Sequence, residues 1–286
     1  MARVPATEAC RVPIGKALSS SGGRFHVKHR VPVIQLASNP EGSGLNNLPQ
    51  ASSELLSNLC DSAGLRVTEA HQSVLLAYLA ALIRMNERLN LTRIVECNDA
   101  IRMHIVDSLM CLPEILKAPD GELCDIGTGG GLPGVPLCVV SGRPGALLDS
   151  VGKKAGALNE ILAELHLEES IKAVPARSEE HAKTHRGGYA VVTARAVSSL
   201  PALIEMAAPL LSSRGILVAL KGAPSAEEVR RGMVVAKMVG LQQCDVRYTL
   251  LPGGDERRTV VSYQKIGRSS LRLPRRPGQA HNTPLA

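Results

Sequence analysis

The sequence lacks the patterns on which several large classes of protein depend. It has no tryptophan and one phenylalanine, and its seven cysteines include no C-x-x-C pair. An odd number of scattered cysteines is typical of reduced thiols in a cytosolic protein and argues against a disulfide framework or a zinc site. No apolar run approaches the roughly 18 residues of a membrane-spanning helix, and no secretory signal is present. We therefore expect a cytoplasmic protein with no membrane segment and no metal.

The sequence also lacks the G-x-S-x-G motif of serine hydrolases. His104, Asp107 and Ser108 are spaced at i, i+3 and i+4, so they share one face of a helix and resemble part of a hydrolase triad. Without an acyl-transfer motif, we interpret them as a structural network that holds a helical segment over the functional site.

Positive charge is concentrated at the two ends of the chain, whose net charge is +7. Residues 1–50 carry six basic and two acidic side chains, and residues 265–286 carry five basic side chains and no acid. The part between them is therefore close to neutral. Basic tails of this kind either engage a polyanion such as nucleic acid or only keep the protein soluble, and charge alone does not choose between these.

Amino-acid composition and apolar periodicity divide the chain into four regions. Residues 1–50 are rich in Ser, Gly, Pro and Asn without apolar periodicity, which predicts a disordered basic extension. Residues 51–117 predict a helical subdomain, with one helix from Ser53, a second opening at Thr68 and a third from about Asn98 to Pro113. Residues 118–266 predict a Rossmann-like domain, and residues 267–286 a basic C-terminal tail.

The Rossmann-like region alternates between short apolar strands and helices. The predicted strands are "ELCDI", "ALLD", "IKAV", "YAVVTAR" and "GILVALK", followed by a hairpin made of "CDVRYTL" and "TVVSYQK". This alternation predicts an α/β fold with a mostly parallel, doubly wound sheet. Ligands of such sheets bind at the carboxyl ends of the strands.

A glycine-rich loop follows the first predicted strand, in the stretch "LCDIGTGGGLPGVPL" at 123–137. It contains Gly127, Gly129, Gly131 and Gly134, and its second half matches G-x-G-x-x-G. That pattern alone is compatible with a dinucleotide site or with another nucleotide-like cofactor. Asp125, just before the loop, would repel a pyrophosphate but favour the cationic cofactor S-adenosylmethionine.

Asp149 ends the second predicted strand, 22 residues after Gly127. An acid in this place accepts hydrogen bonds from ribose hydroxyls. It would serve NAD as well as S-adenosylmethionine. A second interpretation, that Asp149 caps the helix that follows, stays open.

Several sequence blocks together resemble one family. They are "NERLNLTRI" (86–94), "HIVDSL" (104–109), "DIGTGGGLPGVPL" (125–137), "LLDSVGKK" (147–154), "ARSEE" (176–180), "TARAVSSL" (193–200) and "LVALKG" (217–222). Over roughly residues 70–265, the chain resembles the bacterial 16S ribosomal RNA guanine-N7 methyltransferases, also called the glucose-inhibited division protein B family.

The resemblance implies a class I S-adenosylmethionine-dependent methyltransferase fold. It also implies methyl transfer to N7 of one guanine in 16S rRNA, free or in an assembling small subunit. By motif match, the cofactor residues are Gly127, Leu132, Ser178, Glu179 and Arg195. Charge and position add Asp125 and Asp149, and the loop itself adds Gly129, whose backbone can approach a ligand closely. Nothing in the sequence requires a dimer, and we expect a monomer.

Guanine N7 carries a lone pair and no proton at neutral pH, so direct in-line attack needs no general base. We therefore predict no catalytic acid or base, and name Arg195 and Lys221 as positioning candidates. The missing Asp/Asn-Pro-Pro-aromatic motif argues against an exocyclic amine target, and "TARAV" has no cysteine for covalent C5 chemistry. The RNA-binding candidates are Lys153, Lys154, Lys221, Arg272, Arg275 and Arg276.

Two other functions stay open at this point. The G-x-G-x-x-G pattern suits an NAD-dependent oxidoreductase, and the two basic ends suit a non-catalytic RNA-binding module.

Overall fold

The computed structural model describes residues 50–286. The basic extension predicted for residues 1–50 lies outside the described residues, except for Gln50. The described part begins with a helical segment, in which two long helices precede a chain of short ones. These are α1 (Gln50–Ser62), α2 (Glu69–Asn86), α3 (Cys97–Ala100), η2 (Ile101–Val106), α4 (Asp107–Leu109) and α5 (Leu112–Ile115).

Both helices predicted first are present, although α1 begins at Gln50 and not at the predicted Ser53. The side chain of Thr68 caps α2 by accepting a hydrogen bond from the backbone N–H of His71 at 3.2 Å. The predicted third helix is wrong as one continuous helix, because a π-helical turn, η2, interrupts it. It also begins earlier than predicted, since the side chain of Glu96 provides the N-cap.

A seven-stranded sheet forms the centre of the fold, with the strand order β3-β2-β1-β4-β5-β7-β6. Strands β1 to β5 pair in parallel, and β7 pairs antiparallel with both β5 and β6. This confirms the predicted α/β fold with a mostly parallel, doubly wound sheet. The strands are β1 (Leu123–Ile126), β2 (Gly145–Leu148), β3 (Ile171–Val174), β4 (Tyr189–Arg195), β5 (Leu211–Lys221), β6 (Leu241–Leu250) and β7 (Arg257–Lys265).

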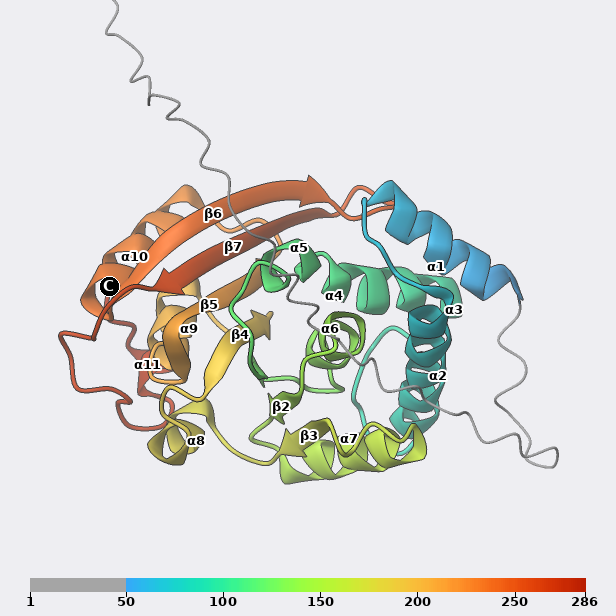
Figure 1. The fold of residues 1–286 in the computed structure, drawn as a ribbon, viewed down its shortest axis with the longest axis horizontal. Coiled ribbons are helices and arrows are strands. Elements are labelled where there is room, and N and C mark those ends of the chain that lie inside the picture. The colour runs from blue at the N-terminus through green and yellow to red at the C-terminus, as the bar shows by residue number, and fades with distance from the viewer. Residues whose placement is uncertain (1–49) are drawn as a thin grey trace, which may run out of the picture. The chain divides into compact units, whose positions relative to one another are not determined.

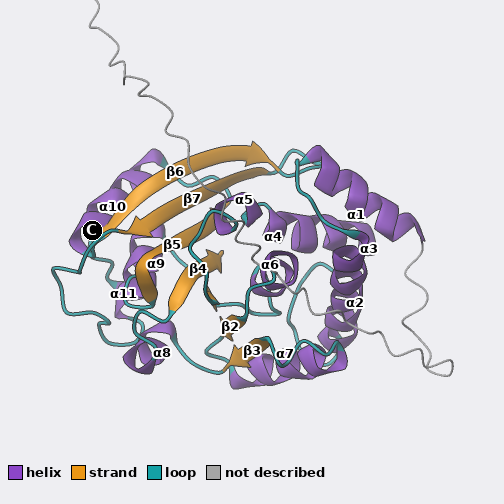
Figure 2. Cartoon of the chain, viewed as in Figure 1, coloured by secondary structure: helices purple, strands orange, loops and turns teal. Residues whose placement is uncertain are grey.

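Helices cover both faces of the sheet, as Figures 1 and 2 show. The helices in the second half are α6 (Gly134–Ser141), α7 (Gly152–Glu164), α8 (Ser178–Thr184), α9 (Leu200–Ala207), α10 (Ala226–Met238) and α11 (Gln279–Asn282). Successive side chains of a strand point to opposite faces, so Val191 packs with α1 to α7 while its neighbour Val192 packs with α8 to α11. The carboxyl ends of the parallel strands are left to form one functional edge.

Residues 267–286 are docked on the body of the protein, whereas the sequence predicted a basic tail. Leu273 and Ala280 are buried in the core beside α9. The guanidinium of Arg275 pairs with both carboxylate oxygens of Glu205, whose side chain is 2% exposed. This buried ion pair and the apolar contacts fix the segment in place.

Candidate functional site

The glycine loop between β1 and α6 has the backbone that its glycines predict. Gly127, Gly129 and Gly131 have φ of +70°, +58° and +103°, a region that side chains disfavour. A Cβ on Gly127 would lie 2.6 Å from a methyl carbon of Val197, whereas one on Gly129 would meet nothing within 4 Å. The loop is therefore packed closely against the chain after β4 and faces open space at Gly129.

Asp125 lies beneath this loop and not at its mouth, which corrects the sequence-based placement. The carboxylate is 0% exposed, and its Oδ2 accepts a hydrogen bond from the N–H of Gly134, the first residue of α6, at 3.0 Å. Burial raises the pKa of Asp125 to about 7. Within the described residues, its Oδ1 and the nearby Thr128 Oγ1 are buried without a hydrogen-bond partner. The site thus holds polar atoms beside the loop that remain unsatisfied.

Asp149 links the loop to the second strand. Its Oδ2 accepts from the Gly129 N–H at 3.0 Å, and its Oδ1 accepts from the N–H of Val151, which precedes α7, at 2.8 Å. The helix-capping interpretation is wrong, because Val151 is the N-cap of α7 and no side chain caps that helix; Asp149 instead accepts from the backbone two residues further on, as in an Asx-turn. The same carboxylate also fixes the loop that the cofactor interpretation requires, at the carboxyl edge of β2.

Helix α2 closes the other side of the loop. Tyr78 is fully buried, and its hydroxyl donates to the carbonyl oxygen of Gly130 at 2.7 Å. Burial raises the pKa of Tyr78, so the hydroxyl keeps its proton and remains a donor. The sequence pattern indicated only a core position for Tyr78, because its apolar spacing carries no sign of the distant loop.

A cavity of about 310 Å³ opens at the carboxyl ends of β4 and β5. Arg195 and Ala196 line this cavity, while the next residue, Val197, is the one that packs against Gly127. The glycine loop and the cavity are therefore neighbours across one short stretch of chain. The lining residues are Ile94, Met103, His104, Asp107, Arg195, Ala196, Leu220, Lys221, Gly222 and Arg258.

Asp107 is clamped between two arginines in the wall of the cavity. Its Oδ2 is 3.1 Å from Nη1 of Arg195, and its Oδ1 is 2.6 Å from Nε of Arg258. The three side chains are 6%, 18% and 14% exposed. The cluster joins the helical segment to β4 and β7, so of the three residues in the predicted structural network Asp107 is the one that makes this link. The sequence analysis missed Arg258. It lies 151 positions after Asp107 in the chain, and no local pattern around Arg258 indicates that the two residues pair.

His104 and Ser108 do not form a hydrolase triad with Asp107. The His104 Nε2 hydrogen-bonds the Thr92 hydroxyl at 2.7 Å, and the Ser108 hydroxyl donates to the His104 carbonyl oxygen. Burial, followed by the charge of Arg195, lowers the pKa of His104. The imidazole is therefore neutral at pH 7, and it lines the cavity without a serine nucleophile.

Lys221 lines the cavity, and its ammonium group already has two partners. Its ammonium donates to the Ser198 carbonyl oxygen at 2.7 Å and lies 3.0 Å from a carboxylate oxygen of Glu228. An ammonium has three donors, so one remains for another partner. The adjoining wall contains Ala196 with φ +55°, and strained residues of this kind are concentrated at functional sites.

Ser178 and Glu179 begin α8, at the carboxyl end of β3. Both are buried, and the Ser178 hydroxyl donates to Glu179 Oε2 at 2.9 Å. Glu179 Oε1 accepts from the N–H of Gly278 at 2.8 Å. The Glu179 carboxylate thus binds the C-terminal segment, and a cofactor role at this helix would fall to its backbone.

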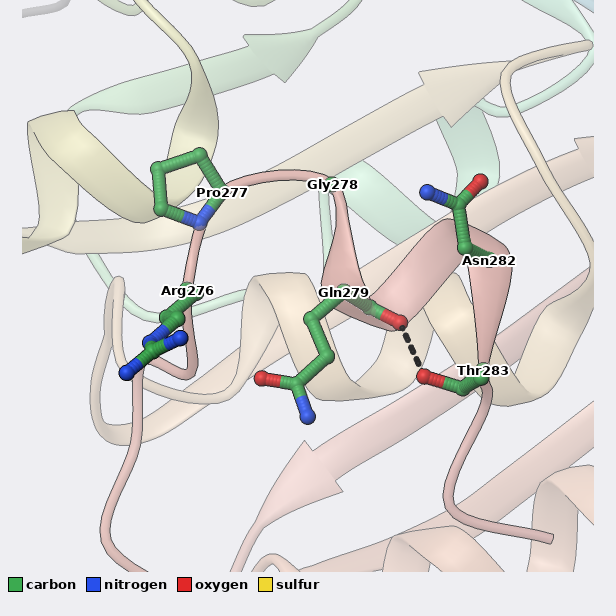
Figure 3. A pocket seen from close by; sticks show the side chains of 6 residues that line it. All are labelled: Arg276, Pro277, Gly278, Gln279, Asn282 and Thr283. Carbon is green, nitrogen blue, oxygen red and sulfur yellow. Dashed lines mark hydrogen bonds between the residues drawn. The ribbon is translucent and has the colours of Figure 1, made fainter.

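The C-terminal segment itself reaches this edge of the sheet. It lines a hollow of about 380 Å³ with Arg276, Pro277, Gly278, Gln279, Asn282 and Thr283, and Figure 3 shows how these side chains lie. The His281 ring also hydrogen-bonds the Ser198 hydroxyl at 3.1 Å, in the loop after β4. The segment therefore bridges the loops that follow β3 and β4.

The predicted RNA-binding residues divide into two groups. Arg275 is committed to Glu205, which corrects its assignment as an RNA contact, because a guanidinium held by a buried carboxylate is not free to meet a phosphate. Lys153, Arg272 and Arg276 are exposed, and Lys154 is half-buried.

Leu132, predicted beside the cofactor, is buried in the glycine loop.

Between residues 50 and 286, no cluster of three or more His, Cys, Asp or Glu side chains is arranged to hold a metal ion. None of the helices in this range has the length and apolar character needed to cross a membrane.

Comparison with known proteins finds a matching family model and similar sequences. The family model described as GidB, rRNA small subunit methyltransferase G, matches residues 71–254. Ribosomal RNA small subunit methyltransferase G of Alkaliphilus metalliredigens is 32% identical over 81% of this chain and 98% of its own length. The protein of the same name from Deinococcus radiodurans is 37% identical over 83% of this chain and 94% of its own length.

Solved structures are similar in fold. The O-methyltransferase from Bacillus cereus in complex with SAH superposes with a TM-score of 0.51 and 15% sequence identity, covering 75% of this chain and 99% of that protein.

Proposed function

Because the chain belongs to the GidB family, rRNA small subunit methyltransferase G, we propose that it transfers a methyl group from S-adenosylmethionine to N7 of a guanine in 16S rRNA. The substrate is the free RNA or the RNA of an assembling small subunit. One observation carries the proposal: Arg195 and Ala196 line the cavity while Val197 packs on Gly127. A cofactor on the glycine loop and a base in the cavity would therefore be neighbours.

The residues around the loop fit S-adenosylmethionine, which when bound supplies an electrophilic methyl group on a sulfonium. Gly129 faces open space, so a ligand can approach its backbone closely. We assign Gly127, Gly129 and Leu132 to the amino-acid part of the cofactor, Asp149 to its ribose, and the backbone of Ser178 and Glu179 to its adenine.

The buried Asp125 contributes charge through the loop and makes no direct contact in this scheme. Its ionised form favours a nearby cation, and its pKa of about 7 makes that contribution sensitive to pH.

The cavity is suited to a guanine. Guanine presents O6 as a hydrogen-bond acceptor next to N7, and arginine and lysine are the side chains that most often recognise this edge. A donor that holds O6 would leave the N7 lone pair free for attack. Arg195, whose bonds to Asp107 and to the Met103 carbonyl use Nη1 alone, and Lys221 retain such donors on the cavity wall, whereas the Arg258 guanidinium is held by Asp107 and its neighbours. A base inside a folded RNA reaches such a pocket only when it is turned out of its stack.

No side chain of the cavity is needed as a general base, because N7 has no proton to lose. This agrees with the observed hydrogen bonds. Both oxygens of Asp107 are held by arginines, and the neutral His104 is bonded to Thr92. We propose that the chain acts by orienting the base, excluding water and holding N7 in line with the methyl group.

The exposed basic residues would bind the phosphates of the substrate. We assign this role to Lys153, Lys154, Arg272 and Arg276, with the remaining N–H of Lys221 at the cavity. Phosphate contacts of this kind position the RNA and weaken with salt.

Labelled methyl transfer tests the proposal. Purified protein is incubated with radiolabelled S-adenosylmethionine and small subunits that lack the modification, and counts in the RNA are measured. We expect incorporation into 16S rRNA, thermal stabilisation by S-adenosylhomocysteine and none by NAD(H). Stabilisation by NAD(H) alone would support an oxidoreductase, and RNA binding without transfer, unaffected by Asp149→Ala, would support a binding module.

A further inference from the structure

A second concave surface lies beside the proposed guanine cavity, on the hairpin formed by β6 and β7. It is a groove of about 490 Å³ lined by Ala223, Pro224, Tyr248, Thr249, Leu250, Arg257, Arg258 and Thr259. We propose that this groove binds the nucleotide next to the target guanine, with its base stacked on Tyr248 and its phosphate on Arg257. The inference rests on the proposed function, since it names a further contact for the same RNA.

Tyr248 is unlike the other tyrosines of the chain. Tyr78, Tyr189 and Tyr263 are at most 2% exposed, whereas Tyr248 is 70% exposed. Leu250, two residues further along the same strand, is 54% exposed. Neighbouring apolar surface left open in this way marks an interaction site more often than chance.

The pairing of the strands places a cation on the same face as the ring. Side chains alternate along a strand, so Tyr248 and Leu250 share one face of β6. Leu250 is paired with Arg257 on β7, and cross-strand partners lie on the same face. Arg257 is exposed, and its acidic neighbour Glu256 is already bound to Arg102. An aromatic ring beside an exposed guanidinium is the combination that single-stranded RNA recognises, through base stacking and phosphate pairing.

The groove adjoins the guanine cavity around the end of β5. Arg258 lines both of them. The turn after β5 also connects them, since Lys221 and Gly222 line the cavity while Ala223 and Pro224 line the groove. An RNA strand whose guanine enters the cavity would therefore have its next nucleotide over Tyr248. Turning the guanine out removes a stacking partner from that nucleotide, and the tyrosine ring would replace it.

The test compares Tyr248→Ala with two controls, Tyr248→Phe, which keeps the ring, and Ile266→Ala, which removes an apolar side chain that is 63% exposed outside the groove. For each protein, the Kd values for deproteinised 16S rRNA and for small ribosomal subunits are measured by filter binding, and the KM values for RNA and for S-adenosylmethionine are measured by methyl transfer. We expect Tyr248→Ala to raise the Kd and KM for RNA by roughly ten-fold, with the KM for S-adenosylmethionine unchanged. Both controls should stay within about two-fold of the wild type.

Two results would overturn the inference. The first is an unchanged Kd for RNA in Tyr248→Ala. The second is a defect seen only with ribosomal particles and absent with deproteinised RNA, which would show that Tyr248 contacts a ribosomal protein. Failure of the proposed function has a different signature: the wild type itself would transfer no methyl group to RNA. The binding measurement would still decide whether Tyr248 contacts RNA.

Discussion

Asp107→Ala offers the most quantitative check of the site, because this residue holds two arginines of the cavity wall. The substitution leaves Arg195 and Arg258, which are 18% and 14% exposed, without their shared counter-ion. Removing one partner of a buried ion pair costs about 3–5 kcal/mol. For a protein of this size, about 2–4 °C are lost per kcal/mol, so the expected drop in Tm is roughly 6–20 °C.

The control for this substitution is Glu227→Ala, whose partner Arg230 lies one helical turn away. Those side chains are 56% and 63% exposed, so solvent screens their attraction and Tm should hardly move. Differential scanning fluorimetry measures both variants, and calorimetry with S-adenosylhomocysteine measures the cofactor site. We expect Asp107→Ala to be destabilised and slow in methyl transfer, yet to bind S-adenosylhomocysteine with its normal Kd at a temperature where it is folded. A Tm drop no larger than that of the control would refute the assignment of a buried ionic clamp.

Three further predictions follow from the contacts of the loop and the C-terminal segment. The raised pKa of Asp125 means that the folded protein keeps a proton between about pH 4 and about pH 7 that the unfolded chain has lost. Its stabilising contribution is therefore present at low pH and lost as the pH rises through 7; urea unfolding across this range should show that Asp125→Asn removes the dependence, and identical profiles would contradict it. Gly129→Ala and its control Gly142→Ala each place a methyl group at a similar positive φ, facing open space, so each should lower the free energy of unfolding by about 1–2 kcal/mol. Calorimetry should show that only Gly129→Ala loses affinity for S-adenosylhomocysteine. Equal affinities would argue against a ligand at the loop. Arg275→Ala should destabilise the fold by about 3–5 kcal/mol, because it leaves the buried Glu205 carboxylate unpaired. The exposed Arg276→Ala should leave stability unchanged and weaken RNA binding at low salt. Chemical denaturation and filter binding measure the two effects; a destabilised Arg276→Ala beside an unchanged Arg275→Ala would contradict the docked segment.

The sheet and its loop could be predicted from the sequence because their signals are local. Short, largely apolar runs mark the parallel strands, although β5 begins at Leu211, four residues before the predicted "GILVALK". The glycines mark the positive φ angles that the loop adopts. The cap at Thr68 likewise acts over three residues. Each of these signals lies inside the element that it specifies.

The walls of the cavity could not be predicted in the same way, because they depend on pairs that are distant in sequence. Asp107 meets Arg258 only after the sheet has brought β7 beside β4 and β5. The π-helical turn η2 departs from the 3.6-residue period on which helix prediction rests.

Two placements went wrong because a charged residue was read as exposed. Asp125 is buried under the loop, and Arg275 is held by Glu205. A signal for the second was present, since Glu205 is the single charge in the apolar helix "LPALIEMA", and a buried carboxylate needs a partner.

The position of the methyl group in the RNA decides whether the cavity presents guanine N7 to the cofactor. Small subunits lacking the modification are treated with the protein and S-adenosylmethionine, and the 16S rRNA is reduced and cleaved with aniline, which breaks the chain at N7-methylguanine. We expect one new cleavage site, at a guanine, which is lost with Gly129→Ala and weakened with Arg195→Ala. Methyl incorporation without aniline cleavage would place the group on another atom, and would contradict the proposal that the cavity presents guanine N7.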